Sequence, residues 1–269
     1  MTAQPRLPLT IVVAVSPNNG IGVGGTLPWR LAREMAYFKH VTSHVAPSAS
    51  ASAGSSGSSG GKNAVIMGRN TWESIPPRFR PLGGRVNVVI SGTATAEELG
   101  IDKAQDTHLF ASPQAALAYL RERSASQSLS RVFLMGGAQL YAQALQAAAQ
   151  AHGGNGNDSA NEWDLDRLLV TRIIKPGYPQ CDVFLPEFRT AEQIEVEGQA
   201  LGTAQTAGDG ERSAAPSAPP LERKLWERAS GAELEAYVAS QVPGIDSLQG
   251  VQEEKGVSYE FQMWTRVTQ

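Results

Sequence analysis

The stretch that decides the fold is Leu9 to Phe38, LTIVVAVSPNNGIGVGGTLPWRLAREMAYF. Its first part, Leu9 to Val15, is a nearly continuous apolar run rich in β-branched residues, which is typical of a strand covered on both faces. A loop with four glycines follows between Asn18 and Gly25, and Pro28 and Trp29 close it. This order predicts a buried strand, then a glycine-rich loop, then a helix.

The helix after this loop carries one acidic residue among apolar ones. Leu31, Glu34, Met35 and Phe38 lie at i, i+3, i+4 and i+7, so they share one face. A buried carboxylate is costly unless a cation or a hydrogen-bond donor meets it. Glu34 therefore either lies at the edge of this face, where it reaches water or pairs with Arg30, or it is a functional acid.

The glycine loop also matches a nucleotide-binding pattern. Gly20 to Gly25 satisfies G-x-G-x-x-G literally. That fingerprint requires a helix that opens at the last glycine and an acidic residue about 20 positions further on. The segment Thr26-Leu27-Pro28 interrupts the helix start, and no Asp or Glu occurs between Glu34 and Glu73. The Rossmann interpretation is therefore excluded.

The composition is that of a soluble globular protein. The chain has 269 residues, 41% hydrophobic and 18% charged, with a net charge of −3, which is enough for one domain with a full core. The slight acidity argues against a nucleic-acid partner. Cys181 stands alone, which excludes an internal disulfide and suits a reducing compartment. No long apolar run or secretory signal is present, so we expect a cytoplasmic protein without membrane contact.

Further along the chain, buried apolar runs alternate with helical segments. We expect strands at Asn63–Met67, Arg85–Ile90, Thr107–Ala111, Arg131–Met135, Leu165–Ile174, Val183–Leu185 and Val257–Val267, and helices after Gly68, over Pro113–Arg123 and over Ala138 to about Ala149. The alternation predicts an α/β fold with a central, mostly parallel mixed sheet of about eight strands and flanking helices. The last strand alternates in polarity, which indicates an antiparallel strand at or near the sheet edge.

Three stretches of low complexity interrupt this pattern. Ala46 to Gly61 consists almost wholly of Ser, Ala and Gly, and Gly-rich segments recur at Ala151–Asn161 and Gly198–Pro220. Such segments cannot bury enough surface to order themselves. Because all three fall between expected elements, we expect a single domain over residues 1–269 with loop insertions near 46–61, 151–161 and 198–220.

Two glycine-containing junctions follow buried strands and precede helices, at Gly136-Gly137 and at Gly68-Arg69-Asn70-Thr71. The free N–H groups and the dipole of a helix start attract anions, and glycine lets a phosphate come close. Arg69 adds a cation that suits a phosphate. The alternatives are a simple tight turn at Gly136-Gly137 and an ordinary surface arginine at Arg69.

Three further polar features each allow a functional and a structural interpretation. Arg85 begins a strand, and a guanidinium there suits a bidentate grip on a carboxylate, although a salt bridge to a nearby acid is the alternative. Thr171 lies in the apolar run LLVTRII, where β propensity alone explains a threonine. His40 and His44 have a spacing compatible with a metal, but a third ligand is missing, so we expect no metal.

Taken in order, these motifs resemble the dihydrofolate reductase family. Val12-Val13-Ala14, Gly20-Ile21-Gly22, Leu27-Pro28-Trp29 and Glu34 with Phe38 are similar to the family's first strand, mobile loop and substrate-binding helix. The segment VQEEKG-x-x-Y-x-F at Val251–Phe261 is similar to eukaryotic, fungal-type members. The resemblance covers roughly residues 7–45, 62–150, 163–190 and 222–268 and implies a dihydrofolate-reductase-like fold.

The resemblance implies NADPH-dependent reduction of 7,8-dihydrofolate to 5,6,7,8-tetrahydrofolate, which supports one-carbon metabolism, with thymidylate and purine synthesis. It also implies antifolate inhibitors as ligands and a monomer. Hydride passes from the nicotinamide to C6 of the pterin, while an ionised Glu34 accepts hydrogen bonds from N3 and the 2-amino group and favours protonation of N5 from water. The loop Asn18–Trp29 closes over the rings and excludes water. The residues assigned to catalysis are Glu34, Leu27, Trp29 and Thr171, which hydrogen-bonds Glu34.

The resemblance also assigns the binding residues. Those for dihydrofolate are Val12, Val13, Glu34, Met35, Phe38, Ile75, Phe79, Leu82, Arg85 and Thr171, with Arg85 on the α-carboxylate of the glutamate tail. Those for NADPH are Ala14, Ile21, Gly25, Thr26, Gly68, Arg69, Asn70, Thr71, Ser91, Gly92, Gly136, Gly137, Ala138, Gln139, Leu140 and Tyr141, with a cis peptide between the paired glycines. Gly92 stands where an arginine is common, so preference for NADPH over NADH rests mainly on Arg69.

Two other functions stay open at this point. The pyrimidine reductase of riboflavin synthesis shares the fold and the use of NADPH, but Leu27-Pro28-Trp29 and Glu34 argue against it. A pseudoenzyme that only binds folate or a nucleotide is the second alternative, and intact Glu34, Trp29 and Thr171 argue against that. Oxidation of NADPH that depends on dihydrofolate distinguishes the three.

Overall fold

The computed structural model describes residues 7–45, 61–102, 105–126, 128–151, 163–202 and 219–267. The chain divides into two compact units, Met1–Val12 with Ala36–Asp166, and Val13–Met35 with Arg167–Gln269. We call these the first unit and the second unit. Three elements, β1 (Pro8–Val15), α1 (Ala32–Ser43) and β7 (Asp164–Lys175), have residues in both.

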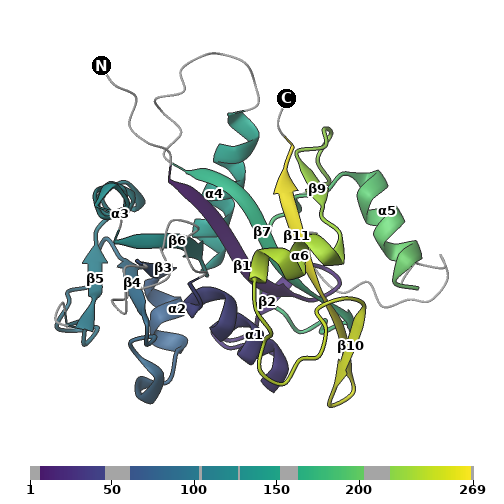
Figure 1. Ribbon diagram of the computed structural model, residues 1–269, viewed down its shortest axis with the longest axis horizontal. Helices are drawn as coiled ribbons and strands as arrows, with labels where there is room; N and C mark the ends of the chain where they lie inside the picture. The colour runs from purple at the N-terminus through teal and green to yellow at the C-terminus, as the bar shows by residue number, and fades with distance from the viewer. Residues whose placement is uncertain are drawn as a thin grey trace, which may run out of the picture. The chain divides into compact units, whose positions relative to one another are not determined.

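A parallel sheet is the core of the first unit (Figure 1). Its strands follow the order β1-β6-β3-β4-β5, and every neighbouring pair is parallel. The bounds are β3 (Lys62–Gly68), β4 (Arg85–Ile90), β5 (Thr107–Phe110) and β6 (Leu129–Leu134). The run Ala64–Met67 in β3 is fully buried because both faces of the sheet are covered, which is why these strands read as continuous apolar runs.

Three helices lie wholly in the described part of the first unit, namely α2 (Arg69–Ser74), α3 (Pro113–Ala125) and α4 (Ala138–Gln150). Helix α3 packs on β4, β5 and β6, as Figure 1 shows beside β5, and α2 packs on β3 and β4. Proline at the first turn of α3 and the Ser112 side chain, which accepts a hydrogen bond from the Ala115 N–H, start that helix. A short 3-10 turn, Pro77–Phe79, follows α2.

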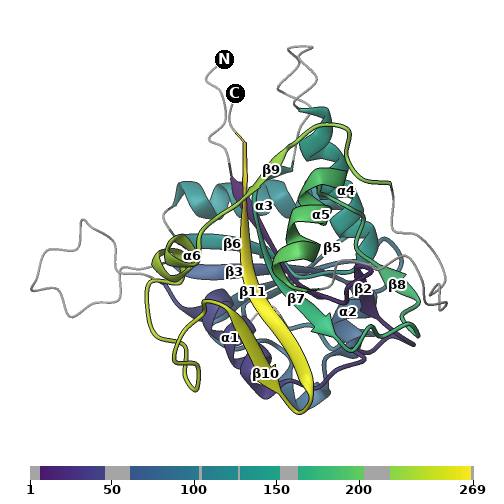
Figure 2. The ribbon, with the colours of Figure 1, turned by 90° about the vertical axis from the view of Figure 1, so that its right-hand side faces the viewer.

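Antiparallel strands dominate the second unit. The long strand β11 (Val257–Arg266) pairs with β7 on one side and with β10 (Val251–Glu254) and β9 (Trp226–Arg228) on the other; Figure 2 shows the β10–β11 hairpin in yellow. Strand β11 is therefore one strand in from the edge. All residues from Val257 to Trp264 are buried, so the expected alternation of exposed and buried side chains does not occur.

The remaining elements of the second unit are short. Strand β2 (Gly20–Gly22) pairs antiparallel with β8 (Val183–Phe184), and the helices are α5 (Ala191–Ala200) and α6 (Gly231–Val238). Helix α6 packs on β11. Both helices begin with a capping box, Thr190 with Gln193 and Ser230 with Glu233, in which each side chain bonds the other residue's backbone N–H.

The predicted fold class is confirmed, because the mostly parallel strands, the flanking helices and the antiparallel C-terminal strand are all present. The predicted strands and helices recur within a few residues of the expected bounds. Strands β2, β9 and β10 and helices α5 and α6 were not predicted, although the two capping boxes are a sequence signal for the helices. Of the three predicted insertions, residues 46–60, 152–161 and 203–218 lie outside the described residues, whereas Gly198–Ala200, predicted to begin the third insertion, form the end of α5. The single-domain assignment stays a prediction.

No helix among the described residues combines the length and the apolarity needed to cross a membrane. Within the same ranges, no group of three or more His, Cys, Asp and Glu side chains could hold a metal ion. The rings of His40 and His44 stack on each other, with their centroids 5.0 Å apart.

The parallel sheet of the first unit predicts where truncation is most damaging. Phe133, near the end of β6, is completely buried, whereas Phe79 is 55% exposed. We expect Phe133→Ala to lower the free energy of unfolding by about 3–5 kcal/mol, because it leaves a cavity between close-packed strands. The matched variant Phe79→Ala should cost below about 1 kcal/mol, since it opens no cavity. Urea unfolding monitored by circular dichroism measures both, and equal losses would contradict the assignment of β6 to the core.

Candidate functional site

Glu34, in the first turn of α1, is a buried acid of the second unit. It is 6% exposed, and one carboxyl oxygen accepts a hydrogen bond from the Thr171 hydroxyl of β7 at 3.4 Å. The alternative in which Glu34 reaches water is therefore wrong. The buried residues of α1 are Glu34, Tyr37, Val41 and Thr42, and Leu31 just before the helix is buried too, whereas Met35 is 50% exposed. Met35, which shares this helix face by its spacing, is thus exposed, because packing turns Glu34 and Tyr37 inward instead.

Burial dominates the electrostatics of Glu34. It raises the pKa of this carboxyl group to about 7, against the opposing effect of the Thr171 hydrogen bond, and the charge of Glu254 raises it further. Glu34 therefore exchanges its proton near neutral pH, well above the usual range of a carboxyl group. A carboxyl group poised in this way can accept hydrogen bonds from a ligand or hold a proton.

The glycine loop of the second unit is tied down at its base. Arg172, buried in β7, donates hydrogen bonds to the Ser16 carbonyl (3.2 Å) and to the Asn19 side chain (2.7 Å). Gly20 packs so closely that an added Cβ would lie 2.5 Å from the Cβ of Cys181, so only glycine fits there. Beyond it, Gly24 and Gly25 have φ values of +54° and +76°, which a residue with a side chain rarely adopts.

The end of this loop presents two predicted catalytic residues in different ways. Leu27 is 47% exposed, whereas Trp29 is buried and its ring packs edge-on against Tyr178 with centroids 5.2 Å apart. The indole N–H of Trp29 has no hydrogen-bond partner among the described residues. A buried donor without a partner is uncommon in folded proteins, so this N–H is suited to a ligand or a bridging water.

Arg85 is a buried cation of the first unit without a carboxylate partner among the described residues. Its guanidinium donates to the Thr42 hydroxyl (2.7 Å) and to the Gly83 carbonyl (3.2 Å), and both oxygens are neutral. The Thr42 hydroxyl in turn donates to the Phe38 carbonyl at 2.7 Å, which fixes its orientation. Within the described ranges, Arg85 therefore forms no structural salt bridge. Burial lowers the pKa of Arg85 to about 10, which leaves it cationic at neutral pH.

The two glycine junctions of the first unit lie side by side. The Gly68 N–H donates to the Gly136 carbonyl at 2.9 Å, and the predicted cis peptide between Gly136 and Gly137 is confirmed. An added Cβ at Gly136 would lie 3.0 Å from the Thr71 hydroxyl. Gly137 and Gly68 stand at the N-caps of α4 and α2, where no side chain caps the first-turn N–H groups. At the start of α4 these donors are free to meet an anion.

The other residues predicted to bind the cofactor's phosphates have local partners. Arg69 is exposed and pairs with Glu73 at 3.8 Å, which is a weak surface interaction. The Ser91 hydroxyl accepts hydrogen bonds from the N–H groups of Thr93 and Ala94, and Gly92 beside it is exposed. Tyr141 is buried and donates to the Val12 carbonyl at 2.9 Å, so its hydroxyl has a structural role.

Three of the exposed large apolar side chains belong to predicted site residues. The large apolar residues that are exposed in the described chain are Leu27, Met35, Phe79, Val183, Val196 and Val251. The first three were assigned to the loop and to the substrate, and Ile75 and Leu82 are half-buried.

A family model described as dihydrofolate reductase matches residues 8–46 and 58–208. The chain belongs to the dihydrofolate reductase family. It is 38% identical over 269 residues to a dihydrofolate reductase of Cryptococcus neoformans, covering 98% of this chain and 97% of that protein. It is 34% identical to that of Pneumocystis carinii, covering 96% of each chain, and 40% identical over 187 residues to that of Saccharomyces cerevisiae, covering 68% of this chain and 74% of the yeast protein. The predicted resemblance to a fungal-type, oxidoreductase family is confirmed.

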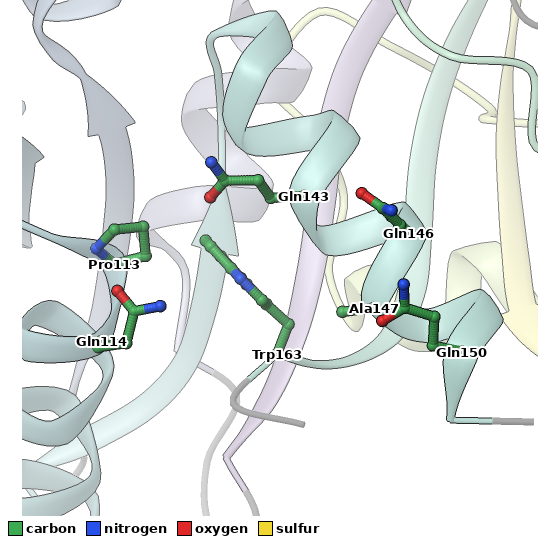
Figure 3. A pocket seen from close by; sticks show the side chains of 7 residues that line it. All are labelled: Pro113, Gln114, Gln143, Gln146, Ala147, Gln150 and Trp163. Atoms are coloured by element: carbon green, nitrogen blue, oxygen red, sulfur yellow. The ribbon is translucent and has the colours of Figure 1, made fainter. Parts of the chain in front are cut away.

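Membership of the dihydrofolate reductase family gives no role to one hollow of the first unit. A depression of about 340 Å³ is lined by Pro113, Gln114, Gln143, Gln146, Ala147, Gln150 and Trp163. Figure 3 shows the amide side chains of α4 turned toward it, with Trp163 opposite. Its lining carries no charged or titratable group, so it offers nothing for acid–base chemistry, and it contains none of the predicted site residues.

Two residues with direct contacts to the candidate site of this dihydrofolate reductase family member were not predicted. Thr42 orients Arg85, and Glu254 accepts hydrogen bonds from the start of α1, the helix that carries Glu34. The sequence signal for Glu254 is its place in the VQEEKG segment, which resembles fungal-type members but indicates no role for this residue. Thr42 had no signal beyond its position four residues after Phe38. The roles of the predicted site residues stay predictions.

The raised pKa of Glu34 predicts a stability cost at high pH. The unfolded chain loses this proton near pH 4.5 and the folded chain only near pH 7, so the folded chain binds more protons in that interval. The free energy of unfolding therefore falls as pH rises, by up to about 3 kcal/mol. Glu34→Gln does not titrate, so its stability relative to the native chain should rise by a similar amount from about pH 4.5 to about pH 8. Urea unfolding of both proteins across this range measures it; a difference that is constant with pH would disprove the shift.

Proposed function

We propose that the chain reduces 7,8-dihydrofolate to 5,6,7,8-tetrahydrofolate with NADPH. The observation that carries this proposal is the buried carboxyl group of Glu34, whose hydrogen-bond partner is a neutral hydroxyl and not a cation. A site of this kind suits a flat ring that presents N–H donors, because such donors satisfy the carboxylate without a counter-ion. Membership of the dihydrofolate reductase family supports the same substrate.

In this proposal Glu34 anchors the pterin. One oxygen remains available beside the one that Thr171 meets, so the carboxylate can accept hydrogen bonds from N3 and the 2-amino group. An acceptor with a pKa near 7 is also well placed to favour proton uptake by the ring at N5, with water delivering the proton. Leu27 and the loop before it cover the ring and exclude bulk water, and the free indole N–H of Trp29 holds an ordered water or the ligand itself.

In this proposal Arg85 binds the glutamate tail of the substrate. Its positive charge has two neutral partners, and Thr42 holds the guanidinium in one orientation, so an incoming carboxylate finds a preorganised cation. The exposed ring of Phe79, with Ile75 and Leu82, packs on the aminobenzoyl group. This set of side chains distinguishes a folate from a small pyrimidine, which has no such tail.

The residues of the first unit fit NADPH. The uncapped N–H groups at Gly137, Ala138 and Gln139 suit its pyrophosphate, and Arg69, Asn70 and Thr71 with Ser91 suit the phosphate on its adenosine. When bound, NADPH supplies the hydride that the reduction requires. Arg69 is the main cation in this set, and its exposed pairing with Glu73 leaves it able to reorient toward a phosphate.

Turnover tests this proposal directly. Purified protein should oxidise NADPH, followed by absorbance, only when dihydrofolate is added, and methotrexate should block the reaction at near-stoichiometric amounts. Glu34→Gln should lower kcat/KM by roughly a hundredfold or more, because it removes the charge that binds the pterin, while the Kd for NADPH is unchanged. The exposed Glu122→Gln is the control and should behave as the native protein. Tight NADPH binding without turnover would disprove the assignment and point to a pyrimidine reductase or a pseudoenzyme.

The contact between Thr42 and Arg85 gives a second test. Thr42→Val keeps the volume but removes the hydroxyl that orients Arg85, so KM for dihydrofolate should rise roughly tenfold at unchanged kcat. For dihydropteroate, which lacks the glutamate tail, KM should not change. Ser43→Ala, which removes a neighbouring exposed hydroxyl that bonds only the Lys39 carbonyl, is the control. An equal rise in KM for both substrates would contradict the role of Arg85 in binding the tail.

A further inference from the structure

Glu254, at the end of β10, caps the helix that carries Glu34. Its two carboxylate oxygens accept hydrogen bonds from the backbone N–H groups of Ala32 (2.7 Å) and Arg33 (3.0 Å), the first two residues of α1. The residue before them, Leu31, has no side-chain oxygen to offer as an N-cap, although its carbonyl accepts the first helical bond from Met35. A side chain more than two hundred positions away therefore does what an N-cap residue normally does.

Further contacts fix the β10–β11 hairpin to the same turn of α1. The Arg33 guanidinium donates to the Glu253 carbonyl and lies 4.0 Å from the Glu254 carboxylate, and the Lys255 ammonium donates to the Arg30 carbonyl at 3.5 Å. Lys255 and Gly256 form the hairpin turn with φ values of +52° and +78°, as a tight two-residue connection requires. The hairpin thus meets α1 through several independent bonds, in the second unit alone.

The hairpin also pairs with the strand that carries the hydrogen-bond partner of Glu34. Strand β11 continues from the hairpin and pairs with β7, where Phe261 lies opposite Thr171. Thr171 contacts the Glu34 carboxyl group, and Glu254 contacts the backbone two and one residues before it. Strand β11 therefore links β10, which caps the helix of Glu34, to β7, which supplies the hydrogen-bond partner of its side chain.

From this geometry we propose that Glu254 is a positioning residue for Glu34: its carboxylate fixes the start of α1 and places a second negative charge near the acid. This inference rests on the proposed function for its consequence in catalysis. A carboxylate at a helix N-terminus also interacts favourably with the helix dipole, so the cap is strong enough to define where the first turn lies. Glu254 does not touch the substrate in this proposal and acts through Glu34.

The charged and titratable groups around Glu34 in the second unit give the proposal a specific signature. They are Glu254 from β10, Tyr259 from β11 and Arg33 on α1 itself, beside the neutral Thr171 from β7. Burial raises the pKa of Tyr259 to about 12, with Glu254 and Glu34 adding to the shift and Arg33 opposing it, so Tyr259 is neutral at physiological pH. Because Glu254 raises the pKa of Glu34, its removal should lower that pKa.

Two variants separate the geometry of the cap from its charge. Glu254→Gln keeps the length but loses the charge and one acceptor, whereas Ala32→Pro removes one N–H donor at the first helical position, where proline is favoured, and leaves Glu254 charged. The control is Glu253→Gln, whose side chain accepts from Ser258 and not from α1. The measurements are steady-state kinetics against dihydrofolate across pH, the Kd for NADPH by fluorescence, and a ¹³C NMR titration of the Glu34 carboxyl carbon.

We expect Glu254→Gln to raise KM for dihydrofolate roughly tenfold, with an unchanged Kd for NADPH, and to move the acid limb of kcat/KM and the Glu34 titration to lower pH. Ala32→Pro should raise KM without moving the titration, and Glu253→Gln should match the native chain. Native KM and titration in both variants, or equal weakening of both ligands, would overturn the proposal. If Glu254→Gln does not fold, the KM of Ala32→Pro for dihydrofolate tests the cap: a raised KM supports the proposal, and a native KM overturns it. A native chain that leaves dihydrofolate unreduced refutes the proposed function instead, and the NMR titration still tests Glu254.

Discussion

The burial of one carboxyl group, Glu34, is the constraint on which the second unit depends. A buried acid that lacks a cation is costly, and the structure meets that cost only in part, with a hydroxyl of β7 at 3.4 Å. Because this compensation is incomplete, burial raises the pKa of Glu34 to about 7. Such a deficit persists only where the surroundings hold the group in place, which here requires a capped helix start and a long strand pair. The missing cationic partner lowers the stability of the folded chain, and it also leaves the Glu34 carboxyl group available to a ligand.

In the first unit the constraint is different: backbone N–H donors must lie together along one edge of the parallel sheet. Gly68 ends β3, Gly136 follows β6, and Ser91 follows β4, and these three strands are neighbours in the parallel sheet. Because parallel strands end at the same edge, the residues after them gather there without any special contact. Helix starts along that edge carry glycine at the N-cap, so their donors are not consumed by side chains. Arg85 differs, since it stands at the beginning of its strand and owes its place to Thr42.

Much of this arrangement could be predicted from the residues alone. The β-branched runs at Leu9–Val15 and Arg85–Ile90 predict buried strands because a parallel sheet is covered on both faces. An acid within an apolar helix face is visible in the sequence, and so are paired glycines between a strand and a helix. The helix period alone did not decide which side of α1 is buried, because Met35 and Tyr37 are both apolar and tertiary packing selected Tyr37. The partners Thr42 and Glu254 could not be predicted, since bonds between distant segments leave no local pattern.

The long-range cap has a consequence for the order in which the protein is made. During synthesis the first forty-five or so residues leave the ribosome early, at about 5–20 residues per second, and they already contain Glu34. The Glu254 side chain, which caps the helix of Glu34, lies 222 positions after Ala32, the first residue of that helix. Until β10 and β11 have emerged, the nascent chain contains the acid without the cap that orients it and without the strand that pairs with β7. The contacts that fix the start of α1 and bring Thr171 to Glu34 are therefore complete only after translation has passed the hairpin.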